Sequence, residues 1–196
     1  MGAKRRTTMS ATVAVAAVAI GTIAFGGTSD AQDVVATADL RDANGVEVGE
    51  VRFQMRGDRV VGEVEVELPG DSSRFHGFHL HANSDPANGV GCVGPAFTSA
   101  DGHWNPTGAG HGNHAGDLPP LILGPDGRSR AEFDVGHFGP GELTGLAVIV
   151  HAGPDNLANI PTRYTTTGGP GPDATTLAAG DVGARYACGV VKAPGR

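Results

Sequence analysis

Positive charge is scarce in this chain of 196 residues. Lysine and arginine together number 14, against 21 aspartates and glutamates, and the formal net charge is −7. A protein that holds nucleic acid or an anionic membrane surface needs clustered cations to neutralise phosphates. The composition therefore argues against either partner and favours a negatively charged globular domain of ordinary size.

Long apolar runs are also missing, apart from one near the N-terminus. Three cations at positions 4–6 precede an uncharged stretch from Ala11 to Phe25, and small residues follow at 29–31. This order is typical of a signal peptide, and the apolar stretch is short for a membrane span. We therefore expect residues 1–31 to be a signal peptide and residues 32–196 to form one exported domain that does not span a membrane. An uncleaved anchor is the alternative.

Helical periodicity is absent as well, and apolar and polar residues alternate instead. The clearest case, EVEVEL at 63–68, predicts a strand with one face in water. Turns rich in glycine and proline separate seven further strand-like segments, at 34–40, 46–55, 74–82, 118–123, 130–135, 146–152 and 184–191. This spacing predicts an all-β fold, either an antiparallel sandwich or a barrel.

Cysteine is limited to Cys92 and Cys188. In an exported protein a disulfide is the default interpretation of such a pair. Closing a loop of about 100 residues would stabilise the fold by roughly 4–5 kcal/mol in the chain-entropy model. Two free thiols are the alternative.

Two segments interrupt the strand pattern, at 83–118 and 153–183, and both are poor in strand formers. Long loops in a compact domain usually carry function or lack order. The first contains HWNPTGAGHGNHAGD at 103–117, in which three histidines and an aspartate stand among residues too small or polar to build a core. Metal binding could order such a loop, because ligation energy becomes folding energy. A solvated turn is the alternative.

Histidines on the predicted strands complete a candidate metal centre. His79 and His81 are two residues apart on one strand and share a face, while His151 ends another strand. Neutral imidazole suits copper and zinc, and zinc also accepts a carboxylate. The candidate ligands are His79, His81, His103, His111, His114, Asp117 and His151.

Seven ligands suffice for two four-coordinate sites only if one imidazole bridges both metals. The count permits that bridge without proving it. Two histidines are left out of the centre. His76 is expected on the opposite strand face from the pair at 79 and 81, and His137 falls in a predicted turn.

The motifs GFHLH, SADGHWNP, HAGDLP, VIVHAGPDN and GARYACGV follow one another along the chain, from about Val34 to Val191. In this order they resemble the copper,zinc superoxide dismutases of the exported bacterial type. The resemblance implies a flattened eight-strand Greek-key sandwich with two long metal-binding loops, and copper and zinc as cofactors.

The family pattern also implies a role for each matching residue. The copper ligands would be His79, His81, His103 and His151, and the zinc ligands His103, His111, His114 and Asp117, with His103 as the bridge. Asp155 matches an aspartate that ties a copper ligand to a zinc ligand. Arg185 matches an arginine beside the copper, and it would be catalytic together with His103. Cys92 and Cys188 match the disulfide pair. Without the family pattern, Asp155 would be an ordinary turn residue and Arg185 an ordinary strand cation.

The sequence departs from the family pattern in three places. The gap between His111 and His114 is shorter than in animal members, Cys92 lies further ahead of His103, and the loop after His151 is poor in lysine. The last departure matters for charge. The implied substrate is an anion and the chain is net negative, so a local positive field is needed to attract it.

The implied activity is the dismutation of superoxide to dioxygen and hydrogen peroxide by a redox-cycling copper, with a structural zinc. Two alternatives keep the same sandwich: a non-catalytic copper- and zinc-binding or copper-delivery module, and a surface domain with vestigial metals. Such modules typically lose copper ligands or the arginine, and this sequence retains them all. The expected partner is superoxide rather than nucleic acid, with a homodimer among the assemblies the family allows. The expected location is outside the cytoplasm or at the cell envelope.

Overall fold

The computed structural model describes residues 34–71, 73–93, 96–136 and 138–194. The predicted signal peptide and His137 lie outside these residues. Nine strands build the main body of the described residues, and each of the eight predicted segments overlaps at least one of them. They are β1 (Val34–Asp42), β2 (Glu47–Arg56), β3 (Arg59–Glu67), β4 (Phe75–His76), β5 (Phe78–His81), β6 (Leu121–Ile122), β7 (Arg128–Gly136), β8 (Ala147–His151) and β11 (Arg185–Val190).

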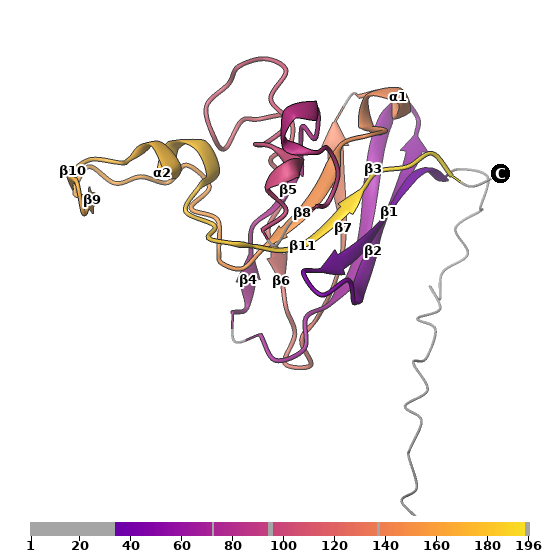
Figure 1. Ribbon diagram of the computed structural model, residues 1–196, viewed down its shortest axis with the longest axis horizontal. Helices are drawn as coiled ribbons and strands as arrows, with labels where there is room; N and C mark the ends of the chain where they lie inside the picture. The colour runs from indigo at the N-terminus through magenta and orange to yellow at the C-terminus, as the bar shows by residue number, and fades with distance from the viewer. Residues whose placement is uncertain (1–33, 72, 94–95, 137, 195–196) are drawn as a thin grey trace, which may run out of the picture.

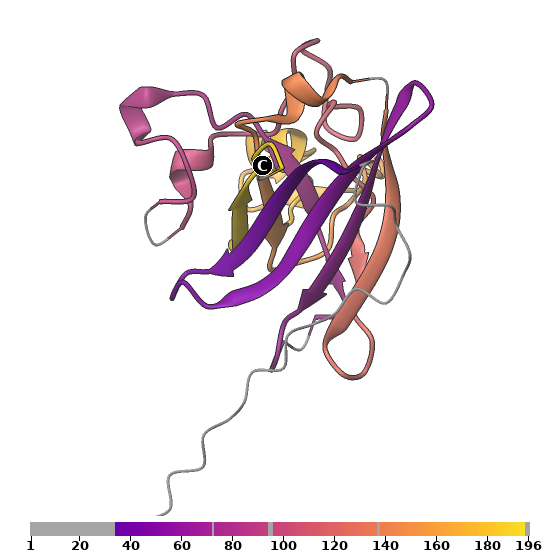
Figure 2. The ribbon, with the colours of Figure 1, turned by 90° about the vertical axis from the view of Figure 1, so that its right-hand side faces the viewer.

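Seven strands form one antiparallel sheet in the order β5-β8-β11-β1-β2-β3-β7, and β4 pairs separately with β6. The sheet curls so that its two outer strands face each other across the interior (Figure 2). The ring of Phe78 on β5 lies edge-on to that of Phe133 on β7, with centroids 5.3 Å apart. Since these strands are at opposite ends of the sheet order, the contact closes the curl around a shared core. The predicted all-β Greek-key class is confirmed.

Period-two alternation places the apolar residues of each strand in this core. Val60, Val64 and Val66 of β3 are buried there, whereas the glutamates between them are half-buried on the other face. A second, smaller cluster lies on the outer face of β8 and β11, where Phe97 and Ala100 cover Ile149 and Cys188. The predicted disulfide between Cys92 and Cys188 is present, with Cα atoms 5.6 Å apart, and it fastens this covering segment to β11.

Two predicted strands differ in detail from expectation. The segment at 74–82 divides at Gly77, where a Cβ would lie only 2.4 Å from Cγ1 of Val182, so the chain passes too close for any side chain. The segment at 118–123 yields only the two residues of β6. Pro119 and Pro120 precede that strand, and proline has no amide donor for a ladder.

The two long loops carry short elements of their own (Figure 1). The first contains the 3-10 turns Pro86–Asn88 and Thr98–Ala100. The second contains the hairpin of β9 (Thr165–Thr166) and β10 (Gly169–Pro170) and the helix α2 (Ala174–Ala179), and it projects away from the sheet. A further helix, α1 (Pro140–Leu143), precedes β8. No helix in the described part of the chain has the length and apolarity needed to cross a bilayer.

Candidate metal centre

The edge of β5 positions the first loop. Leu80 donates its backbone N–H to the Gly116 carbonyl at 2.8 Å and accepts the Trp104 N–H at 2.8 Å, while Leu118 donates to the Phe78 carbonyl at 3.2 Å. The loop therefore continues the sheet beyond β5. This pairing sets His103 opposite His81 and Asp117 opposite His79. Gly116 is required at the contact, because a Cβ there would lie 2.2 Å from the Leu80 carbonyl oxygen.

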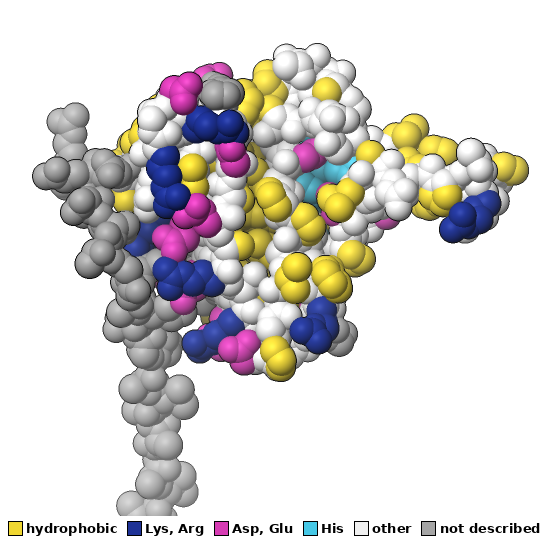
Figure 3. All heavy atoms as spheres, turned by 180° about the vertical axis from the view of Figure 1, so that it is seen from behind, with side chains coloured by type: hydrophobic (Ala, Val, Ile, Leu, Met, Phe, Trp, Pro, Cys, Tyr) yellow, Lys and Arg dark blue, Asp and Glu magenta, His cyan; other side chains and the backbone are white. Residues whose placement is uncertain are grey.

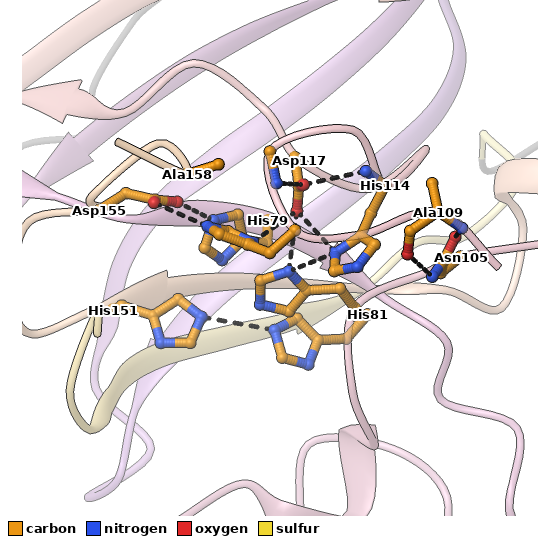
Figure 4. Close-up of polar contacts among 12 residues, drawn as sticks. His79, His81, Asn105, Ala109, His114, Asp117, His151, Asp155 and Ala158 are labelled. Carbon is orange, nitrogen blue, oxygen red and sulfur yellow. Dashed lines mark hydrogen bonds and ion pairs between the residues drawn. The ribbon is translucent and has the colours of Figure 1, made fainter. Parts of the chain in front are cut away.

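The first cluster contains the four histidines at 79, 81, 103 and 151, each of which offers a ring nitrogen within 4.8 Å of the others. His79 and His81 project from the outer face of β5, and His151 ends the neighbouring β8 (Figure 4). His81 donates its Nδ1–H to the Asp101 carbonyl at 2.8 Å, which leaves Nε2 with its lone pair, 3.4 Å from Nε2 of His151. The buried Nδ1 of His79 and Nε2 of His103 have no hydrogen-bond partner.

The rings of His81, His103 and His151 are held in their neutral form, because their pKa values are lowered. Burial, followed by the neighbouring His79, His103 and Arg185, lowers the pKa of His151 to about 3. Burial and the nearby His103 ring hold the pKa of His81 well below its usual range, and burial also lowers the pKa of His103. Neutral imidazoles keep the lone pairs that a metal ion needs.

The second cluster contains His103, His111, His114 and Asp117. Oδ1 of Asp117 lies 2.8 Å from Nδ1 of His103, 3.2 Å from Nδ1 of His114 and 3.5 Å from Nδ1 of His111. The Nδ1 atoms of His103 and His114 are 3.2 Å apart. A tetrahedral zinc with bonds of about 2.0–2.1 Å has donor atoms about 3.3 Å apart, so these four separations suit such a site.

The hydrogen bonds of this cluster do not account for all of its polar atoms, since the buried Nδ1 of His111 has no hydrogen-bond partner. Burial alone would raise the pKa of Asp117, but hydrogen bonds from His103 and from the His114 amide outweigh it and hold the pKa well below its usual range. The cluster thus offers three imidazoles and one carboxylate, a donor set that zinc accepts.

His103 belongs to both clusters. Its Nδ1 lies beside Asp117 and His114, while Nε2, on the other side of the ring, is left for the first cluster. One ring can therefore serve two ions through its two nitrogens, as the ligand count allowed.

Asp155 connects the clusters a second time, from behind. Its Oδ2 accepts a hydrogen bond from Nε2 of His79 at 2.7 Å, and its Oδ1 accepts one from Nε2 of His111 at 2.8 Å (Figure 4). Burial opposes ionisation, but these two hydrogen bonds outweigh it and lower the pKa of Asp155 to about 2. Protonation at Nε2 leaves Nδ1 of both rings as the free donor atom. Gly180, at the end of α2, lies directly against the hydrogen bond between Asp155 and His111.

Arg185 lies opposite His151 in the pairing of β11 with β8. Its Nη1 donates to the Phe97 carbonyl and its Nη2 to the Asp101 carbonyl. A cavity of about 500 Å³ opens at this point, and Arg185 is the one cation among the described residues that line it. The other lining residues are His81, Gly102, His103, His151, Thr175, Ala178, Ala179, Asp181, Val182 and Gly183. Figure 3 shows histidine side chains at a hollow where the projecting loop leaves the body.

His76 was left out of the centre and is not a member of either cluster. It supports one of them, however, because its buried ring donates Nδ1–H to the backbone carbonyl of His151 at 2.7 Å. A second unforeseen contributor is the Asp101 carbonyl, which serves both His81 and Arg185. A backbone contact of this kind has no side-chain signature in a sequence.

A curled β-sheet that carries two histidine-rich clusters with one shared ring defines a protein built to hold two metal ions side by side. The chain belongs to the copper/zinc superoxide dismutase family, whose model matches residues 47–191. The two clusters can accordingly bind copper and zinc.

Individual relatives agree with this family. A Cu-Zn superoxide dismutase of Mycolicibacterium paratuberculosis is 36% identical over 168 residues, which cover 80% of this chain and 74% of the relative. A Cu-Zn superoxide dismutase of Brassica juncea is 35% identical over 166 residues, which cover 79% of this chain and 94% of that relative. The crystal structure of the Cu/Zn superoxide dismutase from Brucella abortus superposes with a TM-score of 0.55 at 28% identity, over 79% of this chain and 97% of that one. A double mutant of a SOD-like protein from Bacillus subtilis gives a TM-score of 0.59 at 26% identity, over 79% of this chain and 95% of that one.

Proposed function

We propose that this chain catalyses the dismutation of superoxide. In this proposal His79, His81, His103 and His151 hold copper, and His103, His111, His114 and Asp117 hold zinc. The observation that carries it is the shared His103 ring, with one nitrogen toward each cluster, at a cavity whose lining includes Arg185. The reaction consumes two superoxide anions and two protons and yields one dioxygen and one hydrogen peroxide.

When bound in the first cluster, copper supplies the one-electron redox chemistry. The protein supplies charge, geometry and protons. Arg185 presents a planar cation to the cavity, which suits a small anion. His103 lines the same cavity, and its Nε2 makes no hydrogen bond, so this nitrogen could hold a proton when it is not bound to copper and pass that proton to the reduced product.

In this proposal the second cluster holds the His103 ring in position and takes no part in the redox chemistry. His103, His111, His114 and Asp117 would hold the zinc, and this ligation would keep the His103 ring in place while its Nε2 exchanges a proton. Asp155 keeps His79 and His111 in the tautomer that presents Nδ1 to the metals. Uncharged residues of α2 form part of the cavity wall, namely Thr175, Ala178 and Ala179, so attraction of the substrate depends strongly on Arg185.

We further propose that residues 1–31 are a cleaved signal peptide and that the mature domain works outside the cytoplasm. The order of charged, apolar and small residues supports this, and the disulfide between Cys92 and Cys188 agrees with an oxidising compartment. N-terminal sequencing of the exported protein would test the cleavage. Assembly as a homodimer stays a prediction that light scattering can test.

The decisive experiment combines metal analysis of the purified protein with an assay of superoxide consumption. We expect one copper and one zinc per chain and rapid catalysis in the loaded protein. Copper binding without superoxide consumption would instead favour the copper-delivery module. Failure to bind copper at all would contradict both functions.

A further inference from the structure

Asp101 has a backbone conformation that is rare for a residue with a side chain. It ends the second 3-10 turn with φ 62° and ψ −156°. This region of conformational space is populated almost only by glycine. Something must hold Asp101 there, because an unrestrained aspartate would relax to a negative φ.

The carbonyl of Asp101 faces the proposed copper site. It accepts a hydrogen bond from Nδ1–H of His81 at 2.8 Å and another from Nη2–H of Arg185. The same oxygen therefore orients one ring of the first cluster and the guanidinium of Arg185 at the cavity. A rotation of this peptide would misdirect both groups together.

The carboxylate of Asp101 points the other way, to the start of the disulfide loop (residues 83–93 and 96–101). Its Oδ2 accepts the backbone N–H groups of Ser84 at 2.6 Å and of Asp85 at 2.9 Å. These bonds tie the end of the loop to its beginning. The disulfide from Cys92 to Cys188 fixes the middle of the same loop to β11, three residues after Arg185.

We propose that Asp101 is a positioning residue for the reaction: its carboxylate anchors the disulfide loop and thereby holds its own carbonyl on Arg185 and His81. The inference rests on the proposed function. Glycine at this position would adopt the backbone conformation without strain but would lose the anchor. Alanine would lose the anchor and keep the strain.

Three variants separate these effects. Asp101→Asn keeps an oxygen that can accept two N–H groups, and asparagine tolerates a positive φ better than most residues. We expect the azide dissociation constant of this variant to match that of the parent within about twofold. Asp101→Ala should lose the alignment of Arg185. In Asp101→Gly the loss of alignment should be intermediate between those of Asp101→Asn and Asp101→Ala. Asp126→Ala is the matched control, because Asp126 is an exposed aspartate that accepts a backbone N–H, from Arg128 at 3.2 Å, in a turn before β7.

Azide, a small anion, is the probe of the aligned arginine in copper-loaded protein. Titration by visible absorption should give an azide dissociation constant about tenfold higher in Asp101→Ala and about threefold higher in Asp101→Gly, with the Asn and control variants near the parent. Copper content should be equal throughout. A second readout needs no metal: limited proteolysis of metal-free protein should cut the disulfide loop faster in the Ala and Gly variants only.

Parent-like azide affinity and protease resistance in Asp101→Gly would overturn the proposal, because the carboxylate would then be dispensable. Equal losses in Asp101→Asn and Asp101→Ala would overturn it too. If Asp101→Ala fails to fold, the Asn and Gly variants carry the comparison. A parent that binds copper and azide without consuming superoxide would refute the proposed dismutase function, while the comparison among variants would still measure the role of Asp101.

Discussion

Substitution of Gly180 by alanine tests how closely α2 is packed on the carboxylate that joins the two clusters. Gly180 has φ +64°, and a Cβ there would lie 2.2 Å from Nε2 of His111 and 2.3 Å from Oδ1 of Asp155. The methyl group would thus stand where the hydrogen bond between these residues runs. Either the bond breaks or the end of α2 moves outward.

The expected cost has two parts. A left-handed alanine costs about 1–2 kcal/mol, and overpacking at a rigid contact adds about 1–3 kcal/mol. A loss of about 2–5 kcal/mol would lower the melting temperature of a domain this size by about 4–20 °C. Because Asp155 orients His111, zinc affinity should fall by about 10- to 100-fold.

The matched control is Gly108→Ala. Gly108 has a similar φ of +68° but no atom within 4 Å of the added Cβ, so it reports the backbone cost alone. Zinc dissociation constants would be measured by competition with a chromophoric chelator, and stability by thermal unfolding. Equal zinc affinity in the two variants would refute the reasoning, because the contact with Asp155 and His111 would then have no effect on the metal site.

Three further predictions concern the proposed ligands and the cavity. His81→Ala should reduce superoxide consumption more than about 100-fold yet leave the far-ultraviolet circular dichroism unchanged, since the sheet and disulfide persist; equal activity at matched copper would contradict it. His114→Ala and Asp117→Ala should lower zinc content and the melting temperature, because the loop loses the ligation that orders it; unfolding identical to the parent with zinc present would rule out this site. Arg185→Lys should lose part of the activity, Arg185→Ala about tenfold and Arg185→Glu the most, with copper retained and a weaker dependence on ionic strength in Arg185→Ala. An undiminished rate in Arg185→Glu would show that this arginine does not guide the substrate.

The strands could be predicted from the sequence because alternation depends only on which face is buried. β3 follows the EVEVEL pattern, and its valines do enter the core. The helix α2 could not be predicted in the same way, because six residues are too few to show a helical period. Its start depends on the Asp173 carboxylate, which accepts the Thr176 N–H at 2.9 Å, and its end depends on Gly180.

The candidate ligands came from residue type and spacing, and the structure brings all seven together. What a single sequence could not supply was the contribution of the backbone. The role of His76 depends on the carbonyl of His151, and the aim of Arg185 depends on those of Phe97 and Asp101. Carbonyls occur at every position, so only the path of the chain distinguishes these from the rest.

The position of β11 has a consequence for the order of events during synthesis. This strand, the last one among the described residues, lies between β8 and β1, near the middle of the sheet. A chain that emerges from a ribosome starting at its N-terminus can pair β1, β2, β3 and β7 early, but β5 and β8 cannot join this sheet by hydrogen bonds until β11 (Arg185–Val190) has emerged. The same strand brings Arg185 and Cys188. A chain that stalls before β11 would therefore already hold all four histidines of the first cluster, but β5 and β8 would lack the strand that pairs them with the rest of the sheet, and metal loading at that stage would require an incomplete fold.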